Sequence, residues 1–202
     1  MLRPSVFLKD LGSIRKTLLF VTILFVLGII AGWYSTGVLA QFIDQQMGGI
    51  RDIGESLSKS SNPKWNFFVF IFFNNSIKAV LMIFLGLLLG ILPILFLLVN
   101  GAVVGFLVHA SLEQGRSLFD LVVKGLLPHG IIEIPAIIIA CAFGVRMGML
   151  VISSLGGSGK QELKKKWREG FRMAWTASVW IVILLFVAAI IESTITYTLM
   201  RG

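Results

Sequence analysis

The amino-acid sequence predicts an all-α, polytopic membrane protein: a single helical bundle over residues 1–202, with about five transmembrane helices and short interfacial helices. Hydrophobic residues make up 56% of the chain and charged residues only 14%, and the mean hydropathy is +0.91. A soluble domain of this size could not bury so much apolar surface. The apolar runs approach 20 residues and lack the two-residue alternation of a membrane barrel, so we expect helices to cross the membrane.

The first span is predicted over residues 17–34, after a basic N-terminal segment. A cleaved signal peptide is the alternative, because the sequence GVLA before Gln41 resembles a cleavage site; we interpret the segment as a retained span. The following residues, 37–64, carry three acidic and three basic side chains, with apolar residues at helical spacing. This pattern is typical of a helix that lies on the membrane surface.

The apolar stretch that follows is too long for one crossing and predicts a helical hairpin. The sequence LLLGILP, at Leu87–Pro93, divides it into spans of about residues 65–88 and 92–110. In the neutral segment after the hairpin, Ser117 and Asp120 form the pattern of a capping box. This pattern predicts a short interfacial helix.

The last two spans are predicted over residues 128–153 and 173–198, on either side of a strongly basic loop at 156–172. Because basic loops stay in the cytoplasm, this loop and the basic N-terminus both belong inside. The neutral segments 37–64 and 111–127 then belong outside. Five spans with a cytoplasmic N-terminus satisfy every loop, and we expect a multi-pass protein of the cell (plasma) membrane in direct contact with the lipid bilayer.

The net charge of +8 lies mainly beside the spans, which membrane topology explains better than nucleic-acid binding. The sequence GGSGKQ, at Gly156–Gln161, departs from a phosphate-binding loop at two positions. Ser154 stands where that pattern needs glycine, and Gln161 stands where it needs serine or threonine. We therefore predict neither a nucleic-acid nor a nucleotide partner.

Four pairs of glycines stand four residues apart in or beside the spans, an arrangement that lets another helix backbone approach closely. The pairs are Gly28 with Gly32, Gly86 with Gly90, Gly101 with Gly105, and Gly144 with Gly148. Packing within one bundle is the first interpretation. Because a small bundle needs fewer such faces, we also predict that at least one of them joins two copies in a homodimer.

Polar side chains interrupt the apolar spans, where a charged group costs at least about 2.5–3.5 kcal/mol. They are Asn74, Asn75, Lys78, Asn100, His109, His129, Glu133 and Glu192. From the helical rise of about 1.5 Å per residue, Asn75 and Asn100 should lie near the membrane midplane. The same rise brings His109, Glu133 and Glu192 to similar heights near the outer face. His129 is one helical turn from Glu133.

Two prolines mark the start of the fourth span. Pro128 suits the first turn of a helix, where its missing N–H costs nothing. Pro135 falls in the second turn and should free a carbonyl near Ile131. A bend or a water there would expose polar backbone beside Glu133.

Three interpretations of this outer polar layer stay open. The first is a structural network, with Glu133 protonated or paired, the histidines donating, and the asparagines bridging the second and third spans. Alternatively His109, His129, Glu133 and Glu192 bind a small ligand or one divalent metal ion such as zinc, since His and Glu four residues apart can share an ion. The third alternative is catalytic, although the spacing differs from the HExxH of zinc proteases. We predict no obligatory cofactor.

Three stretches resemble the stage II sporulation protein M family, an integral membrane family of largely unknown function. They are FFNNSIKAVLMIFLGLLLGILPILFLLVNGAVVG, LPHGIIEIPAIIIACAFGVRMG and AAIIESTIT. The resemblance spans residues 65–197, and its most specific positions are Asn75, Asn100–Gly101, Pro128–His129–Gly130, Glu133 and Glu192. In spore formers, members of this family are membrane parts of a complex with cell-wall-degrading enzymes at the engulfing septum. The resemblance implies a multispan scaffold or a transporter rather than a known enzyme.

Three functions compete on these observations. The first is an integral membrane scaffold that organises membrane or extracytoplasmic partner proteins. The second is a transporter or channel component for a small ligand or ion, motivated by the midplane asparagines, by Lys78 and by the polar layer. The third is a metal-dependent membrane hydrolase built on that layer. We favour the scaffold and do not predict an enzyme.

Overall fold

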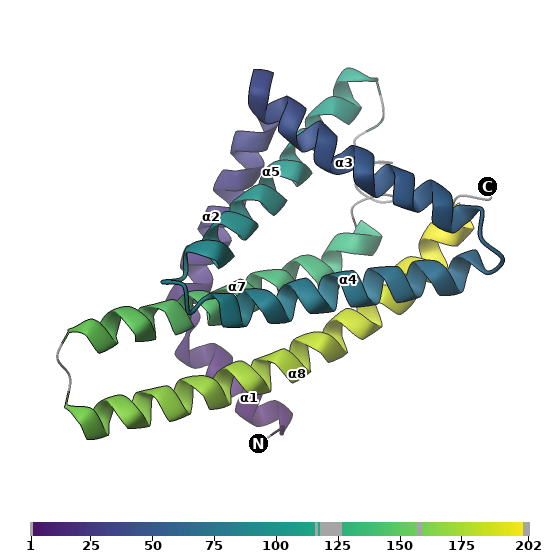
Figure 1. Cartoon of the computed structure of the whole chain (residues 1–202). Helices are drawn as coiled ribbons and strands as arrows, with labels where there is room; N and C mark the ends of the chain where they lie inside the picture. Colours follow the sequence, from purple (N-terminus) through teal and green to yellow (C-terminus); the bar gives the residue numbers. More distant parts are fainter. Residues whose placement is uncertain (1, 116, 118–126, 157–158, 200–202) are drawn as a thin grey trace.

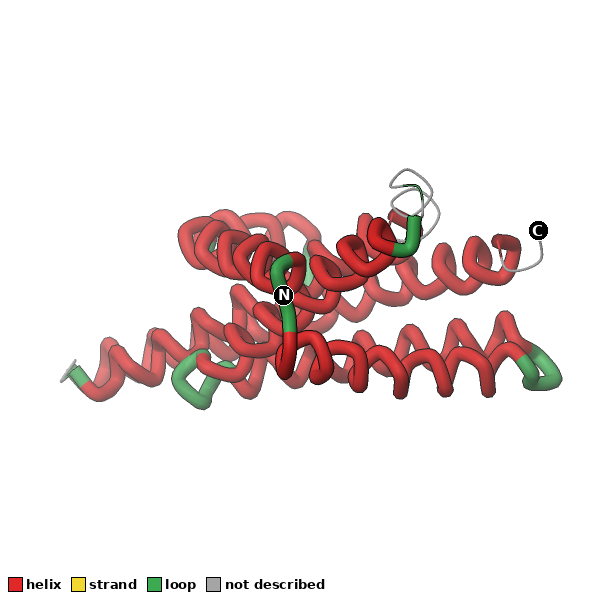
Figure 2. The backbone as a smooth tube through the Cα atoms, turned by 90° about the horizontal axis from the view of Figure 1, so that it is seen from above, coloured by secondary structure: helices red, strands yellow, loops and turns green. Residues whose placement is uncertain are grey.

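The computed structural model of the chain describes residues 2–115, 117, 127–156 and 159–199. Apart from short loops, the described chain is helical (Figure 1; Figure 2). The helices are α1 (Pro4–Ser13), α2 (Arg15–Trp33), α3 (Gly37–Ser58), α4 (Pro63–Leu85), α5 (Ile91–Glu113), α7 (Leu127–Leu155) and α8 (Lys160–Leu199). Within the described ranges, five helices are long and apolar enough to cross a membrane: α2, α4, α5, α7 and α8. The predicted all-α membrane bundle is therefore confirmed.

The five long helices form two arms that diverge from a common region (Figure 1). The first arm is the pair α2 and α5, which run side by side in the same direction. The second arm contains α4, α7 and α8, which pack against one another, and α7 also contacts α2 and α5 where the arms meet. Helix α3 runs from the end of the first arm towards the far end of the second and contacts α5 and α4. The three parts outline a triangle.

The turn between α4 and α5 turns the chain from the second arm into the first. It covers residues 86–90, where the sequence predicted the break of the hairpin. Leu89 and Gly90 have positive φ angles of 57° and 76°. Glycine adopts this left-handed backbone without steric cost, whereas leucine rarely does. Pro93 follows in the first turn of α5, where its missing N–H costs no helical hydrogen bond.

Most of the segment predicted as a loop, residues 156–172, is part of helix α8. It begins at Lys160 and continues as one helix into the last span, up to Leu199. Lys, Gln, Glu, Leu and Arg fill its first turns, and all are good helix formers. Glu162 and Lys166 add an ion pair of 2.7 Å between Oε1 and Nζ, one turn apart. The basic segment is therefore a helical extension of the span.

Two other features differ from expectation or lie outside the described chain. Helix α1 was not predicted as a separate element; it ends before Ile14, where the helical path is interrupted and α2 begins. Helix α7 continues through Pro135 as one helix from Leu127 to Leu155. Asp120, and with it the capping box of the predicted interfacial helix, lies outside the described residues.

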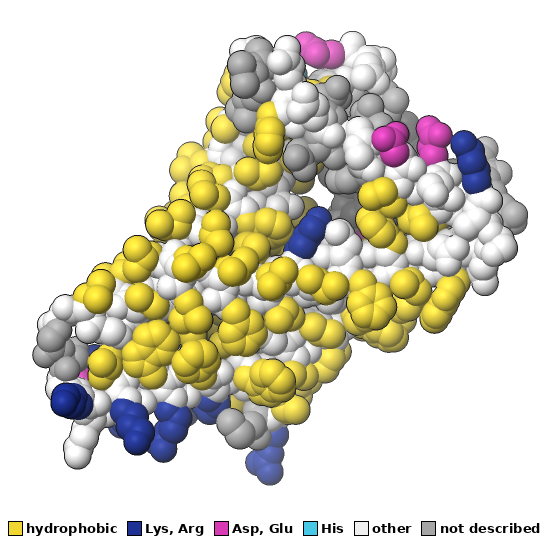
Figure 3. All heavy atoms as spheres, in the orientation of Figure 1, with side chains coloured by type: hydrophobic (Ala, Val, Ile, Leu, Met, Phe, Trp, Pro, Cys, Tyr) yellow, Lys and Arg dark blue, Asp and Glu magenta, His cyan; other side chains and the backbone are white. Residues whose placement is uncertain are grey.

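The core of the molecule lies in the second arm and where the arms meet. Small side chains of α7 and α8, Ala136, Ala140, Ala174 and Ala177, are fully or almost fully buried, so the two helices approach closely. Larger side chains fill the remaining space, and those buried at the centre include Phe143, Ile181, Leu185, Ile83 and Leu97. Many large apolar side chains elsewhere on the spans are exposed, as expected where lipid replaces water (Figure 3).

The glycine pairs are all used within one chain. A Cβ atom added at Gly28 would lie 2.6 Å from the carbonyl oxygen of Leu98, so the backbones of α2 and α5 are nearly in contact. Gly28 and Gly32 lie against α5, Gly101 and Gly105 against α2, Gly86 and Gly90 against α7, and Gly144 and Gly148 against α4, α5 and the turn between them. The expectation that one of these faces joins two copies gains no support from this pairing.

Candidate functional site

The polar layer predicted near one membrane face is divided between the two arms. His109 lies on α5, in the first arm, and its ring packs against Trp33 of α2 with 5.2 Å between ring centroids. Glu133 and Glu192 lie on α7 and α8 of the second arm, which contact each other. Each of these two carboxylates has a polar or ionic interaction partner. The side chain of His129, the fourth predicted member, lies outside the described part of the chain.

The metal-site interpretation requires at least three of these side chains to converge. Among the described residues, no group of three or more His, Cys, Asp or Glu side chains is placed to hold a metal ion. The described part of the layer thus does not supply a metal centre by itself. Because His129 is not part of that description, the zinc hypothesis stays a prediction.

The midplane asparagines make their hydrogen bonds within their own helices. The Nδ2 of Asn74 donates to Oδ1 of Asn75 over 3.1 Å, and the Nδ2 of Asn100 donates to the carbonyl oxygen of Phe96 over 2.7 Å. Neither bond crosses from α4 to α5, in contrast to the expected bridge between these spans. The reason is the divergence of the two helices into separate arms, which leaves only the turn and its surroundings shared.

Lys78 is the most unusual polar residue of the spans, because its side chain is exposed on α4. It lies about two turns, or about 10 Å, before the end of this helix. An ammonium group at such a depth either reaches the interface through its long side chain or faces water or protein.

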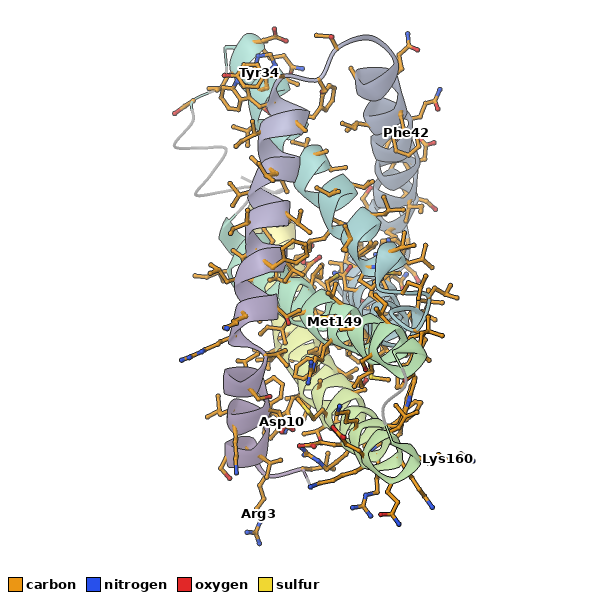
Figure 4. The ribbon with its side chains drawn as sticks, turned by 90° about the vertical axis from the view of Figure 1, so that its left-hand side faces the viewer. Arg3, Asp10, Tyr34, Phe42, Met149 and Lys160 are labelled. Atoms are coloured by element: carbon orange, nitrogen blue, oxygen red, sulfur yellow. The ribbon has the colours of Figure 1, made fainter. Side chains whose placement is uncertain are left out.

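The two basic regions predicted to share the cytoplasm lie at the same end of the molecule. Viewed from the side, Arg3 and Lys160 are at one end, whereas Tyr34 and Phe42 are at the other (Figure 4). Basic side chains gather at the first end and acidic ones near α3 at the second (Figure 3). This arrangement agrees with the charge distribution used to predict the topology.

An ion pair that the sequence analysis missed ties α1 to α8 at the basic end. The guanidinium of Arg172 donates to both carboxylate oxygens of Asp10, with distances of 2.8 and 3.0 Å. Asp10 is only 5% exposed. Its neighbour Phe7 stacks on Phe143 of α7 and on Trp180 of α8. The N-terminal helix is therefore a fixed part of the bundle.

The sequence did contain a signal for this contact. Asp10 is the only acidic residue before the first span, in a segment that otherwise carries basic residues. A lone carboxylate among cations is a candidate for an ion pair, since an aspartate that becomes buried is almost always paired. The partner itself, 162 residues further along the chain, could not be identified from spacing.

The helices α7 and α8 extend past the α4–α5 turn at the basic end, and their extension is braced from inside. The Nε1 of Trp167 donates to Oγ of Ser154 over 2.9 Å, which joins α8 to the last turn of α7. Gly170 is buried against Leu150, so the two helices stay close there. We call this paired extension, residues 149–155 and 160–171, the basic lobe.

In the described chain, five helices long and apolar enough to cross a membrane define a multi-pass helical membrane protein. Residues 21–197 match the family described as stage II sporulation protein M. The chain belongs to this family, as its sequence motifs indicated. An uncharacterised protein of Methanocaldococcus jannaschii is similar to it, with 25% identity over 193 residues that cover 93% of this chain and 84% of that protein. No solved structure matches the chain.

Proposed function

We propose that the protein is an integral membrane scaffold that positions partner proteins at the cell membrane. The observation that carries this proposal is the placement of α3, which contacts both arms at the end opposite the basic lobe. A helix held at both ends presents its exposed side chains in a constant geometry. Constant geometry is what a scaffold needs, because it reduces the entropy lost on binding a partner.

Helix α3 has an anchored N-terminal part and an exposed C-terminal part. Ile43 is only 1% exposed and packs with Ala102 against Val103, Phe106 and Leu107 of α5. Further along, towards its C-terminal end, α3 carries exposed charged and polar residues, including Asp52, Glu55 and Ser58. This polar surface would face the outside in the predicted topology, where extracytoplasmic partners are available.

Photo-crosslinking in native membranes tests the scaffold directly. A benzophenone amino acid at Glu55 or Ser58 should give discrete protein adducts, whereas the same group at Leu27, which is exposed on the lipid-facing span α2, should react with lipid. The adducts at Glu55 should disappear when Asp52 is changed to Asn in the same chain, while the protein stays folded. Adducts of equal yield at all three positions, or none at α3, would refute a partner surface there.

A transporter or channel component is the second candidate, and the exposed Lys78 favours it. The side chains of Asn74 and Asn75 lie one turn away on the same helix, so α4 carries a polar surface towards the interior of the membrane. Such residues commonly mark a path for ions or substrates.

Ion flux through proteoliposomes separates the two candidates. A transport function predicts a flux that Lys78→Met changes strongly and Lys64→Met, at the start of α4, leaves unaltered. A scaffold predicts no flux above that of empty liposomes for either variant. Monovalent cations, protons and chloride would each be measured with a fluorescent dye.

A further inference from the structure

The start of α8 projects beyond the point at which α4 and α5 reverse direction. The turn reaches α7 at Gly148, which lies against Gly90, and Leu150 of α7 in turn contacts Gly170 of α8. The residues that precede Gly170 in α8, from Lys160 to Glu169, therefore lie past the turn, on the basic side of the molecule. The residues that follow it enter the span.

This part of α8 has one face that packs against the lobe and another that does not. Trp167, Gly170 and Met173 are directed towards α7. On the other side, residues at helical spacing line two adjoining shallow grooves that share Lys165, Arg168 and Phe171. We call Lys164, Lys165, Arg168, Phe171 and Trp175 the basic–aromatic face.

Among the residues that the structure describes, the cations of this face form no ion pair. Two carboxylates close to this part of α8 are already paired with other cations. Glu162 binds Lys166, and Asp10 binds Arg172. A third carboxylate, Glu169, lines one groove together with Lys165 and Arg168, and the net charge of these three side chains is positive. A surface with this charge is complementary to a phosphate, which Arg can bind through two parallel hydrogen bonds.

The aromatic side chains follow the cations in the direction of the membrane. Phe171 is 45% exposed and Trp175 is 61% exposed, and exposed apolar residues such as Ile183 and Phe186 come next along α8. Trp175 lies about 10 Å beyond Arg168 along the helix, comparable with the headgroup region of one leaflet, which is about 5–8 Å thick. Tryptophan favours this region because its ring is apolar and its N–H polar.

We propose that the basic–aromatic face of α8 binds an anionic phospholipid of the adjacent leaflet, which is the cytoplasmic leaflet in the predicted topology. Lys165 and Arg168 bind its phosphate groups, while Phe171 and Trp175 pack along the glycerol and the upper acyl chains. The order of cation, aromatic ring and apolar surface along one helix matches the order of groups in such a lipid. The bracing of α8 against α7 and α1 keeps the face formed before the lipid binds.

Native mass spectrometry of the purified full-length protein tests this site. The protein would be released from mixed micelles of phosphatidylglycerol and phosphatidylcholine with identical acyl chains, and the ratio of retained lipids measured. The wild type should retain phosphatidylglycerol preferentially. Lys165→Gln and Arg168→Gln should each lower that preference about fivefold, which corresponds to about 1 kcal/mol for one charge near an anionic surface.

The matched control is Lys166→Gln, because it removes the same charge at the next position, from the other side of the helix. It should leave the preference almost unchanged. An equal loss in Lys165→Gln and Lys166→Gln would show that only the general charge of the lobe matters and would overturn the site. Absence of any preference in the wild type would overturn it as well.

Two further measurements keep the assignment specific. Trp175→Ala should shorten lipid retention without changing the binding of inorganic phosphate, because phosphate has no chains for the ring to contact. If inorganic phosphate or a poly-glutamate peptide protects the protein against thermal unfolding as well as phosphatidylglycerol does, the lipid assignment fails. A melting curve in lipid-free detergent checks that each variant is folded, and Lys165→Arg, which keeps the charge, should retain the preference.

Discussion

The two arms of the molecule differ in what fills most of the space between their helices. In the first arm, α2 and α5 touch through their backbones, because glycines remove the side chains that would separate them. In the second arm, α4, α7 and α8 surround buried side chains such as Phe143, Ile181 and Leu185. A glycine contact of the first-arm kind, Gly86 against Gly144, lies at the end of α4 beside the turn. Close backbone contact leaves no room for an added methyl group, whereas a side-chain core can rearrange to a limited extent. The glycine contacts of α2 and α5 should therefore tolerate small changes less well than the side-chain core of the second arm.

The largest effect is expected from one methyl group in the first arm. In Gly32→Ala, the new Cβ would overlap the backbone of Ala102, so α2 and α5 would have to separate. We expect a loss of about 3 kcal/mol, near the upper end of the usual cost of overpacking. Thermal unfolding in detergent, followed by circular dichroism, would measure it.

The control for this change is Gly54→Ala in α3. Nothing lies within 4 Å of the Cβ position at Gly54, and alanine favours a helix over glycine by about 1 kcal/mol. The two substitutions should have opposite signs. Equal melting temperatures would mean that the glycine contacts of the first arm are not tight, and the contrast between the arms would be lost.

An intermediate effect is expected where the two arms are tied together. Helix α1 continues into the first arm through α2, and Asp10 joins it to Arg172 of the second arm. Asp10→Asn keeps the shape of the side chain but leaves the Arg172 guanidinium without its carboxylate. We expect a loss of about 2 kcal/mol, typical of hydrogen bonds to charged groups that are partly buried.

The exposed pair of Lys59 and Glu55 provides the comparison for this ion pair. Its atoms are 3.5 Å apart and both side chains are more than 70% exposed, so Glu55→Gln should change the stability by no more than about 0.5 kcal/mol. In Asp10→Asn/Arg172→Gln, the loss should be smaller than the sum of the two single losses, because the unpaired charge is removed. Additive losses would show that the two side chains do not act as a pair.

The smallest effect on stability is expected from two exposed cysteine substitutions, whose labelling tests the orientation of the arms in the membrane. In the predicted topology the arms meet on the cytoplasmic side and diverge towards the outside. A membrane-impermeant maleimide should react with Ser58→Cys and not with Lys165→Cys in intact cells. Both positions are exposed, and the native Cys141 is fully buried, so its background should be low. Reversed reactivity would show that both arms have the opposite orientation in the membrane.

The number and nature of the spans could be predicted from sequence because they depend on local properties. The length of an apolar run and the rise of a helix determine whether a segment crosses the bilayer. The relative position of the spans depends on contacts between distant residues, such as Gly32 with Ala102 or Asp10 with Arg172. The spacing of Gly28 and Gly32 indicates a close helix contact but not its partner, and the partner of Asp10 leaves no pattern in the sequence.

The polar layer illustrates the same limit within the candidate site. Helical rise estimates how deep a residue lies, but not where it lies in the plane of the membrane. His109 was predicted at the height of Glu133 and Glu192, yet it is on the first arm beside Trp33, whereas the two carboxylates are on helices of the second. The glycine repeats were easier to interpret, because backbone contact within one bundle was the simplest explanation of their spacing.

The unbroken course of α8 has a mechanical consequence. Its 40 residues give a rod about 60 Å long, whereas a bilayer with its headgroups is about 40–45 Å thick. A rigid rod that crosses the whole bilayer transmits motion: a tilt of 10° about its centre would displace each end by about 5 Å in opposite directions. Pulling on the cytoplasmic end of α8 would therefore move its outer end, beside α4, without any change in the helix itself.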